Sequence, residues 1–340
     1  MRAAATPPST GPIGILLFNL GGPDDLASVE PFLVRLFSDR DIIELPMGAL
    51  LQPIVARIIA RSRGPSVREN YKRIGGGSPQ LRLTRAQAEA LECRLNRGGT
   101  RFRTFIAMRY WYPSTEQALD AMAAEGISRV VTLSLYPHYS QATTGSSEKE
   151  LQRTLARRRW QGRFEVTGIP SYPDDPLYLD AMADTAGRAL AEFAPAVRDR
   201  VVLLFSAHGL PKAFVDRGDP YVEHVEATRQ GILRRLAVPN RHELAYQSRT
   251  GPVEWIGPGT EEMIQRLAAE GVRELLVVPL SFVSDHIETL YEVDMLFADE
   301  ARHRGIVEYR RPAALNTHPV FIEALARLVE RHLEVQAPRA

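Results

Sequence analysis

The stretch Thr115-Glu-Gln-Ala-Leu-Asp-Ala-Met-Ala-Ala-Glu-Gly126 leads into the apolar run Ser128-Arg-Val-Val-Thr-Leu-Ser-Leu135. A matching stretch further along, Thr260-Glu-Glu-Met-Ile-Gln-Arg-Leu-Ala-Ala-Glu-Gly271, leads into Arg273-Glu-Leu-Leu-Val-Val-Pro-Leu280. Each copy has the pattern of an amphipathic helix that ends at a glycine and is followed by a buried strand. The repetition predicts two halves with the same fold.

Two further apolar runs open these halves. Ile13-Gly-Ile-Leu-Leu-Phe18 precedes the glycine-rich Asn19-Leu-Gly-Gly-Pro23, and the run from Val201 to Phe205 has the corresponding place in the second half. Continuous apolar runs separated by helix-length amphipathic segments are typical of parallel strands with helices on both faces. We therefore expect an α/β fold with two similar Rossmann-like halves, each a parallel β-sheet flanked by helices. Ligands of such folds bind outside the carboxyl ends of the strands, so the active site should lie in the cleft between the halves.

The same patterns predict the domain boundaries. We expect a disordered tail over 1–12, an N-terminal half over 13–172, a C-terminal half over 173–330 and a second tail over 331–340. The first twelve residues lack the apolar core of a signal peptide, and no later run approaches the ~18 apolar residues of a membrane span.

Composition excludes several function classes. The chain has 340 residues with 42 Lys plus Arg against 41 Asp plus Glu, so its formal charge of +1 provides no overall field that would attract nucleic acid. The single cysteine, Cys93, cannot form an intramolecular disulfide or hold a thiolate-ligated cluster alone. A cytoplasmic protein without nucleic-acid partners is expected.

Polar residues follow the apolar runs. His208 comes three residues after Phe205, where an imidazole can accept a proton or bind ferrous iron; the alternative is a turn histidine bonded to the main chain.

Glu288 follows the corresponding strand of the second half. At ~3.6 residues per turn, Asp285, Glu288, Glu292 and Asp299 would share one helix face, which suggests a route for cations or protons rather than a solvated acidic surface.

Several motifs together carry a family resemblance. Leu203-Leu-Phe-Ser-Ala-His-Gly-Leu-Pro211, followed by Gly218-Asp-Pro-Tyr221, closely resembles the signature of the ferrochelatases. Segments that look like those of the same family, in its order, are Asn19–Pro23, Tyr71–Pro79, Tyr139-Ser with Thr143–Ser147, Tyr246–Ser248 and Ser284–Tyr291. The resemblance covers residues 13 to 330 and implies a lyase of haem biosynthesis that inserts Fe²⁺, as substrate metal, into a porphyrin.

The resemblance also implies roles for particular residues. His208 and Glu288 would face each other across the porphyrin cleft as catalytic and iron-site residues. Metal insertion exchanges two pyrrole protons for one Fe²⁺, so we assign His208 as proton acceptor or transient iron ligand. Glu288, with Asp285, His286 and Glu292, would be the opposing acid–base and cation route.

Porphyrin propionates need cationic or hydroxyl partners when they are buried. The family positions associated with porphyrin binding fall on Arg63, Tyr71, Ser78 and Arg109. The triple glycine Gly75–Gly77 lacks the Lys-Ser/Thr of a phosphate-binding loop, so we interpret it as a turn that lets the macrocycle approach, and we expect no nucleotide.

The segment 47–63 combines an apolar face with basic residues at its end. One interpretation is a lip that covers the porphyrin, and the other is peripheral membrane contact; both can hold together.

The residues leave the choice of substrate open. Protoporphyrin, with two propionates, is favoured over coproporphyrin, with four, and a [2Fe–2S] cluster is not expected. A non-catalytic porphyrin or haem carrier and a cobalt chelatase acting on a corrin precursor are the competing functions.

Overall fold

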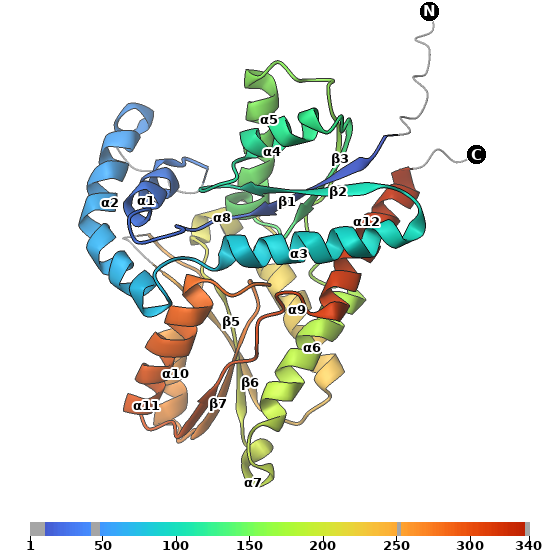
Figure 1. Cartoon of the computed structure of the whole chain (residues 1–340). Helices are drawn as coiled ribbons and strands as arrows, with labels where there is room; N and C mark the ends of the chain where they lie inside the picture. Colours follow the sequence, from blue (N-terminus) through green and yellow to red (C-terminus); the bar gives the residue numbers. More distant parts are fainter. Residues whose placement is uncertain (1–10, 42–47, 250–252, 337–340) are drawn as a thin grey trace, which may run out of the picture.

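The computed structural model describes residues 11–41, 48–249 and 253–336. The chain forms two four-stranded parallel sheets (Figure 1). The first has the order β2-β1-β3-β4 and the second the order β6-β5-β7-β8. The strands are β1 (Ile13–Asn19), β2 (Phe102–Met108), β3 (Arg129–Ser134), β4 (Glu165–Ile169), β5 (Val202–His208), β6 (His242–Gln247), β7 (Glu274–Pro279) and β8 (Glu308–Arg310). The fold class expected from the repeat is confirmed.

Helices connect the strands in both halves. Those up to β4 are α1 (Val29–Ser38), α2 (Gly48–Arg73), α3 (Gln80–Leu95), α4 (Thr115–Ala124) and α5 (Ser146–Arg157). Those after β4 are α6 (Pro176–Ala191), α7 (Pro195–Arg198), α8 (Lys212–Asp216), α9 (Tyr221–Leu236), α10 (Thr260–Ala269), α11 (Ala298–His303) and α12 (Pro319–Gln336). A short 3₁₀ turn covers Asn96–Gly98, and π-helical segments cover Gln141–Gly145 and Glu288–Phe297.

The repeated stretches form equivalent elements. Helices α4 and α10 are each followed by a glycine with positive φ, Gly126 and Gly271, and then by the central strands β3 and β7. Glycine adopts this left-handed conformation without the steric cost of a Cβ, which explains why both helices end there. Serine caps α4, where Ser114 accepts a hydrogen bond from the main-chain N–H of Gln117, and Glu262 accepts one from Gly259 N–H at the start of α10.

Successive side chains of β1 point to opposite faces of the first sheet and pack into two different apolar clusters. Ile13, Ile15 and Leu17 face a large cluster that runs without interruption into the second half and includes residues of α3, α6, α9 and α12. Leu16 and Phe18 face the opposite side, under α4 and α5. A separate cluster under α10 and the segment after β7 fills the outer face of the second sheet. The two halves therefore share one apolar core.

The last helix ties the second half back to the first (Figure 1). Arg94 of α3 binds Glu323 at 2.5 Å and Glu330 at 2.9 Å, and His332 contacts Thr167 of β4 at 2.8 Å. Residues 331–336 continue α12, so this part of the expected C-terminal tail is helical.

The triple glycine forms a turn, as expected, but its close approach is to the protein. Gly75 and Gly76 have positive φ, and a Cβ at Gly77 would lie 2.2 Å from the carbonyl oxygen of Asp24. Glycine is required there because the two chain segments touch.

Candidate functional site

A small cavity of about 40 Å³ lies where the strand ends of the two halves meet. Its lining residues from the N-terminal half are Asn19, Leu20, Gln80, Leu135 and Tyr136, and those from the C-terminal half are Ser281, Phe282, Val283, Ser284, His286 and Glu288. These residues include the loops that follow β1, β3 and β7. The cavity therefore lies at the carboxyl edge of both sheets, where parallel α/β folds bind ligands.

His208 and Glu288 are in direct contact beside this cavity. Nδ1 of His208, the last residue of β5, lies 2.8 Å from Oε2 of Glu288. The resemblance implied that the two residues face each other across the cleft, but they come from neighbouring strand ends of one sheet and lie side by side. The His208 side chain is 41% exposed and that of Glu288 is 14% exposed, so the imidazole is the more accessible partner.

The contact changes the acidity of both groups. Burial alone would lower the pKa of His208, but the carboxylates of Glu288 and Glu292 raise it above its ordinary value. Burial would raise the pKa of Glu288, yet the nearby His208 and His286 hold it well below its usual range. Glu288 is thus an anion, and it favours the imidazole tautomer that carries its proton on Nδ1.

Further donors converge on Glu288. Its Oε2 lies 2.9 Å from Ser248 Oγ and 3.2 Å from Gln247 Nε2, and its Oε1 lies 3.7 Å from His286 Nε2. Such donors stabilise a carboxylate that is shielded from water. Gln247 is the last residue of β6 and Ser248 follows it, so each strand end of the second sheet except that of β8 supplies part of this site.

The pKa of Glu292 lies near neutral pH. Burial and the charge of Glu288 raise the pKa of Glu292 to about 7, and its Oε2 lies 2.5 Å from Ser248 Oγ. The Ser248 hydroxyl therefore lies between two carboxylates of very different acidity, an arrangement that can pass a proton.

The expected stripe of four carboxylates is only partly correct. Asp285 binds Arg311 at 3.1 Å and Asn316, and the exposed Asp299 pairs with Arg302, so neither belongs to the cluster around Glu288. Asp285 precedes the helical segment, and Asp299 follows the π-helix Glu288–Phe297, whose wider turn does not keep the spacing of 3.6 residues that the expectation assumed.

Of the four residues expected to bind porphyrin, the structure brings Tyr71 near the site. Tyr71 is buried, and its pKa is raised by burial and by the charge of Glu288. Ser78 and Tyr71 both lie beside Gly22, in the loop after β1. A Cβ at Gly22 would be 2.6 Å from Ser78 Oγ and 3.7 Å from the Tyr71 hydroxyl.

The two arginines of that set lie elsewhere. Arg109 donates hydrogen bonds to Asp39 at 2.6 Å and to Ser146 at 2.7 Å, and its side chain is 11% exposed. Arg63 is exposed, with its guanidinium 5.7 Å from the centre of the Phe37 ring. Neither contacts His208 or Glu288 in the described part of the chain.

Sequence reasoning assigned no role to three residues that shape the site, Gln247, Ser248 and Tyr136. The first two belong to the segment Tyr246–Ser248, and its resemblance to a family segment was the signal that could have found them. Tyr136 lines the cavity, and its buried hydroxyl has no hydrogen-bond partner among the described residues.

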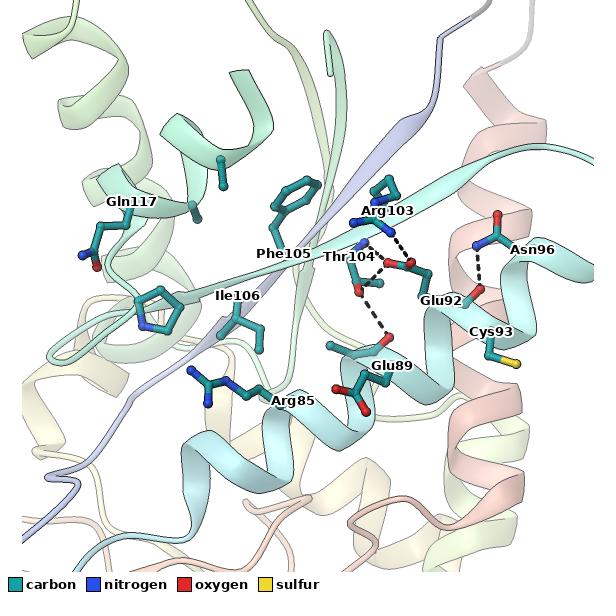
Figure 2. A pocket seen from close by; sticks show the side chains of 14 residues that line it. Arg85, Glu89, Glu92, Cys93, Asn96, Arg103, Thr104, Phe105, Ile106 and Gln117 are labelled. Carbon is teal, nitrogen blue, oxygen red and sulfur yellow. Dashed lines mark hydrogen bonds and ion pairs between the residues drawn. The ribbon is translucent and has the colours of Figure 1, made fainter. Parts of the chain in front are cut away.

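A larger groove of about 660 Å³ lies between α3, β2 and α4 (Figure 2). Two of its charged residues neutralise each other, because Arg103 binds Glu92 at 2.8 Å, and Glu92 also accepts the N–H of Thr104. It contains neither His208 nor Glu288, so size alone does not identify the functional site.

The described residues contain neither a cluster of three metal-binding side chains nor a helix that could span a membrane. Among the described residues, no three His, Cys, Asp or Glu side chains are arranged to hold a metal ion. Nor is any helix in those segments long and apolar enough to cross a membrane.

Comparisons with known proteins show which sequences the chain resembles. The ferrochelatase family profile matches residues 12–333. A ferrochelatase of Geotalea daltonii is 54% identical over 316 residues, which are 93% of this chain and 96% of that protein. One of a Synechocystis species is 48% identical over 320 residues, or 94% of this chain and 82% of that protein.

Solved structures share the fold at low sequence identity. SirB from Bacillus subtilis with Fe³⁺ has a TM-score of 0.55 at 11% identity and covers 94% of this chain and 95% of its own. The sirohydrochlorin chelatase SirB from the subspecies spizizenii, in complex with cobalt, has a TM-score of 0.52 at 12% identity and covers 95% of this chain and 96% of its own.

Proposed function

The chain belongs to the ferrochelatase family, and from this premise we propose that it inserts Fe²⁺ into protoporphyrin IX, forming protohaem and releasing two protons. Members of this family are enzymes that take a porphyrin and ferrous iron as substrates. The observation that carries the assignment of the site is the contact between His208 and Glu288 beside a cavity that both halves line.

The pair suits the first proton transfer. With its Nδ1 proton donated to Glu288, the neutral His208 imidazole keeps a lone pair on Nε2 that can accept a pyrrole proton. Glu288 then stabilises the imidazolium that forms. An accessible imidazole backed by a shielded anion is the arrangement needed for a base that must reach a macrocycle.

The second pyrrole proton can leave through the carboxyl groups of Glu288 and Glu292. A Glu288 carboxyl that has taken up this proton can donate to Ser248 while Ser248 donates to an ionised Glu292, so the proton can pass from Glu288 to Glu292 without a rearrangement of the main chain. Because the pKa of Glu292 is about 7, this carboxyl can both take up and release a proton at neutral pH.

The site would bind iron transiently. His208 and Glu288 offer one nitrogen and one carboxylate as ligands, both of which ferrous iron accepts. The remaining positions of the metal would be filled by pyrrole nitrogens as the iron enters the ring, so the metal is a substrate of this site.

The placement of cations supports protoporphyrin over coproporphyrin. Two additional propionates would need additional cationic partners, and the guanidinium of Arg109 is already bound to Asp39 and Ser146. Arg63 is exposed, which leaves its guanidinium accessible to a propionate. Coproporphyrin is the alternative substrate.

The decisive experiment follows haem formation by absorbance after the purified protein is mixed anaerobically with Fe²⁺ and either porphyrin. We expect turnover with protoporphyrin and a slower reaction with coproporphyrin. His208→Ala should keep only a small residual rate, about a hundredfold to ten-thousandfold below the wild type, whereas His303→Gln, at an exposed histidine of α11, should keep the full rate. Porphyrin binding without iron insertion above the uncatalysed rate would leave the carrier function instead.

We also propose that α2 makes peripheral contact with membranes. Three apolar side chains on one face are exposed, Leu51 by 41%, Ile54 by 53% and Ile58 by 62%. The exposed Arg57 and Arg61 flank this stripe. Apolar side chains beside guanidinium groups suit the boundary between lipid tails and anionic headgroups.

A further inference from the structure

The main chain of His208 is held by a closed ring of hydrogen bonds. Strand β7 pairs with β5 only as far as Ser206 and Pro279, with Leu280 N–H bonding Ser206 C=O just beyond. The N–H and C=O of His208 point to the same side, where β7 has already turned away. Without other partners, both groups would remain unpaired near the base of the site.

Two hydroxyl groups replace the missing strand. The N–H of His208 donates to Ser281 Oγ at 3.0 Å, and the Tyr221 hydroxyl donates to the His208 carbonyl at 2.9 Å. The two hydroxyl oxygens are 2.6 Å apart. Since the Tyr221 proton is used on the carbonyl, Ser281 must donate to Tyr221, which closes a ring of three bonds in one direction.

The ring is connected to the N-terminal half. Tyr221 N–H donates at 3.1 Å to Oδ1 of the buried Asp219, whose Oδ2 accepts from Ser140 Oγ at 2.9 Å and Gln141 N–H at 2.7 Å. Ser140 ends the loop after β3, and Gln141 begins the π-helical segment that follows it. The Gly218-Asp-Pro-Tyr221 motif thus links the placement of that loop to the strand end that carries His208.

We propose that Tyr221 and Ser281 are positioning residues for His208, which set the imidazole against Glu288 and in reach of the substrate. The inference rests on the proposed function, because it explains how the base of that reaction is placed. Neither hydroxyl contacts the reacting atoms. Both act on the main chain of His208, and Asp219 anchors them to the opposite half.

A double-mutant cycle tests this role. We expect Tyr221→Phe and Ser281→Ala each to lower kcat by about tenfold to a hundredfold, the scale of a small misplacement of a catalytic group, with the porphyrin KM unchanged. Ser281→Thr keeps a hydroxyl and should restore part of the rate. In the His208→Ala background, Tyr221→Phe should have no further effect, because its target is gone. An equal loss of rate in both backgrounds would overturn the proposal.

Two further measurements make the test robust. Tyr172→Phe is the matched control, since Tyr172 is a buried phenol whose hydroxyl has no hydrogen-bond partner among the described residues, and it should leave kcat unchanged. The resonance of the His208 Nδ1 proton, assigned by its loss in His208→Ala, reports the contact with Glu288 without any turnover. It should broaden or shift in Tyr221→Phe but not in Tyr172→Phe; an unchanged resonance in Tyr221→Phe refutes the positioning role even if the chain inserts no iron.

Discussion

Nδ1 of His208 lies 2.8 Å from Oε2 of Glu288, although 80 positions separate the two residues in the chain. The contact arises because β5 and β7 are neighbours in one parallel sheet and both end at the same edge. The carboxylate raises the basicity of the imidazole while the outward ring nitrogen stays accessible. Base and counter-ion are therefore positioned by sheet topology rather than by a local motif.

Removal of the Glu288 charge should weaken the base. We expect Glu288→Gln to lower kcat by about a hundredfold, a typical contribution of general base catalysis. The acid limb of the pH–rate profile should also move to lower pH, because the carboxylate is what raises the pKa of His208 against the effect of burial. Steady-state rates from pH 5 to 9 provide the measurement.

Glu300→Gln is a control for this experiment, since Glu300 is bound to Arg304 on the surface of α11, and should change neither quantity. An acid limb in Glu288→Gln at the wild-type position would show that Glu288 does not set the basicity of His208.

Substitution of Glu292 should have an effect that depends on pH. Below about pH 6 its carboxyl is already protonated, because its pKa is about 7, so the neutral Glu292→Gln should resemble the wild type there. Above pH 7 the wild-type carboxylate can accept a proton and the amide cannot. The ratio of wild-type to variant kcat should therefore rise with pH, and a ratio that is constant from pH 5 to 9 would contradict a proton-accepting role.

The sequence predicted the parts of this fold that depend on local periodicity. The four central strands stand where apolar runs occur, and helices α4 and α10 follow the repeated amphipathic pattern. His208 could be placed at a strand end for the same reason. These features were readable because each is decided by residues adjacent in the chain.

Other features depend on contacts that no local pattern encodes. Glu288–Phe297 is a π-helix in which Glu292 contacts Ser248, and Asp299 beyond it is exposed, whereas a regular helix with all four carboxylates on one face was expected. Likewise, α12 packs against α3 through Arg94, which a boundary drawn near residue 173 could not foresee. Main-chain groups that are satisfied by distant hydroxyls, as at His208, require the three-dimensional structure.

Acid should destabilise the protein through His138. This residue is 2% exposed, and its Nε2 donates at 2.9 Å to Thr228, whose own proton goes to the Pro173 carbonyl. Burial and the neighbouring His224 lower the pKa of His138 to about 3, against 6.5 for an ordinary histidine. Between these values the unfolded chain binds a proton that the folded chain does not, so the free energy of unfolding should fall by about 1.4 kcal/mol per pH unit from this residue.

Denaturation by urea at pH 7 and pH 5 measures this contribution. His138→Gln, which can still donate to Thr228, should lose less stability between the two pH values than the wild type, by about 2 kcal/mol. His303→Gln, at an exposed position of α11, controls for the loss of a histidine. Identical pH dependence in the wild type and His138→Gln would show that His138 is not held neutral in the folded protein.

The exposed stripe on α2 should bind membranes. Combined replacement of Leu51, Ile54 and Ile58 by Asn removes apolar surface that would enter the lipid boundary, and we expect sedimentation with anionic vesicles to fall by at least about tenfold. Arg57→Gln with Arg61→Gln should remove the salt-sensitive part of binding, because the guanidinium groups attract the headgroups. Val307→Asn, which alters a residue 67% exposed outside α2, is the matched control and should bind like the wild type. Unchanged sedimentation of the triple variant would contradict contact through α2, and the stripe would then serve the porphyrin as a lip.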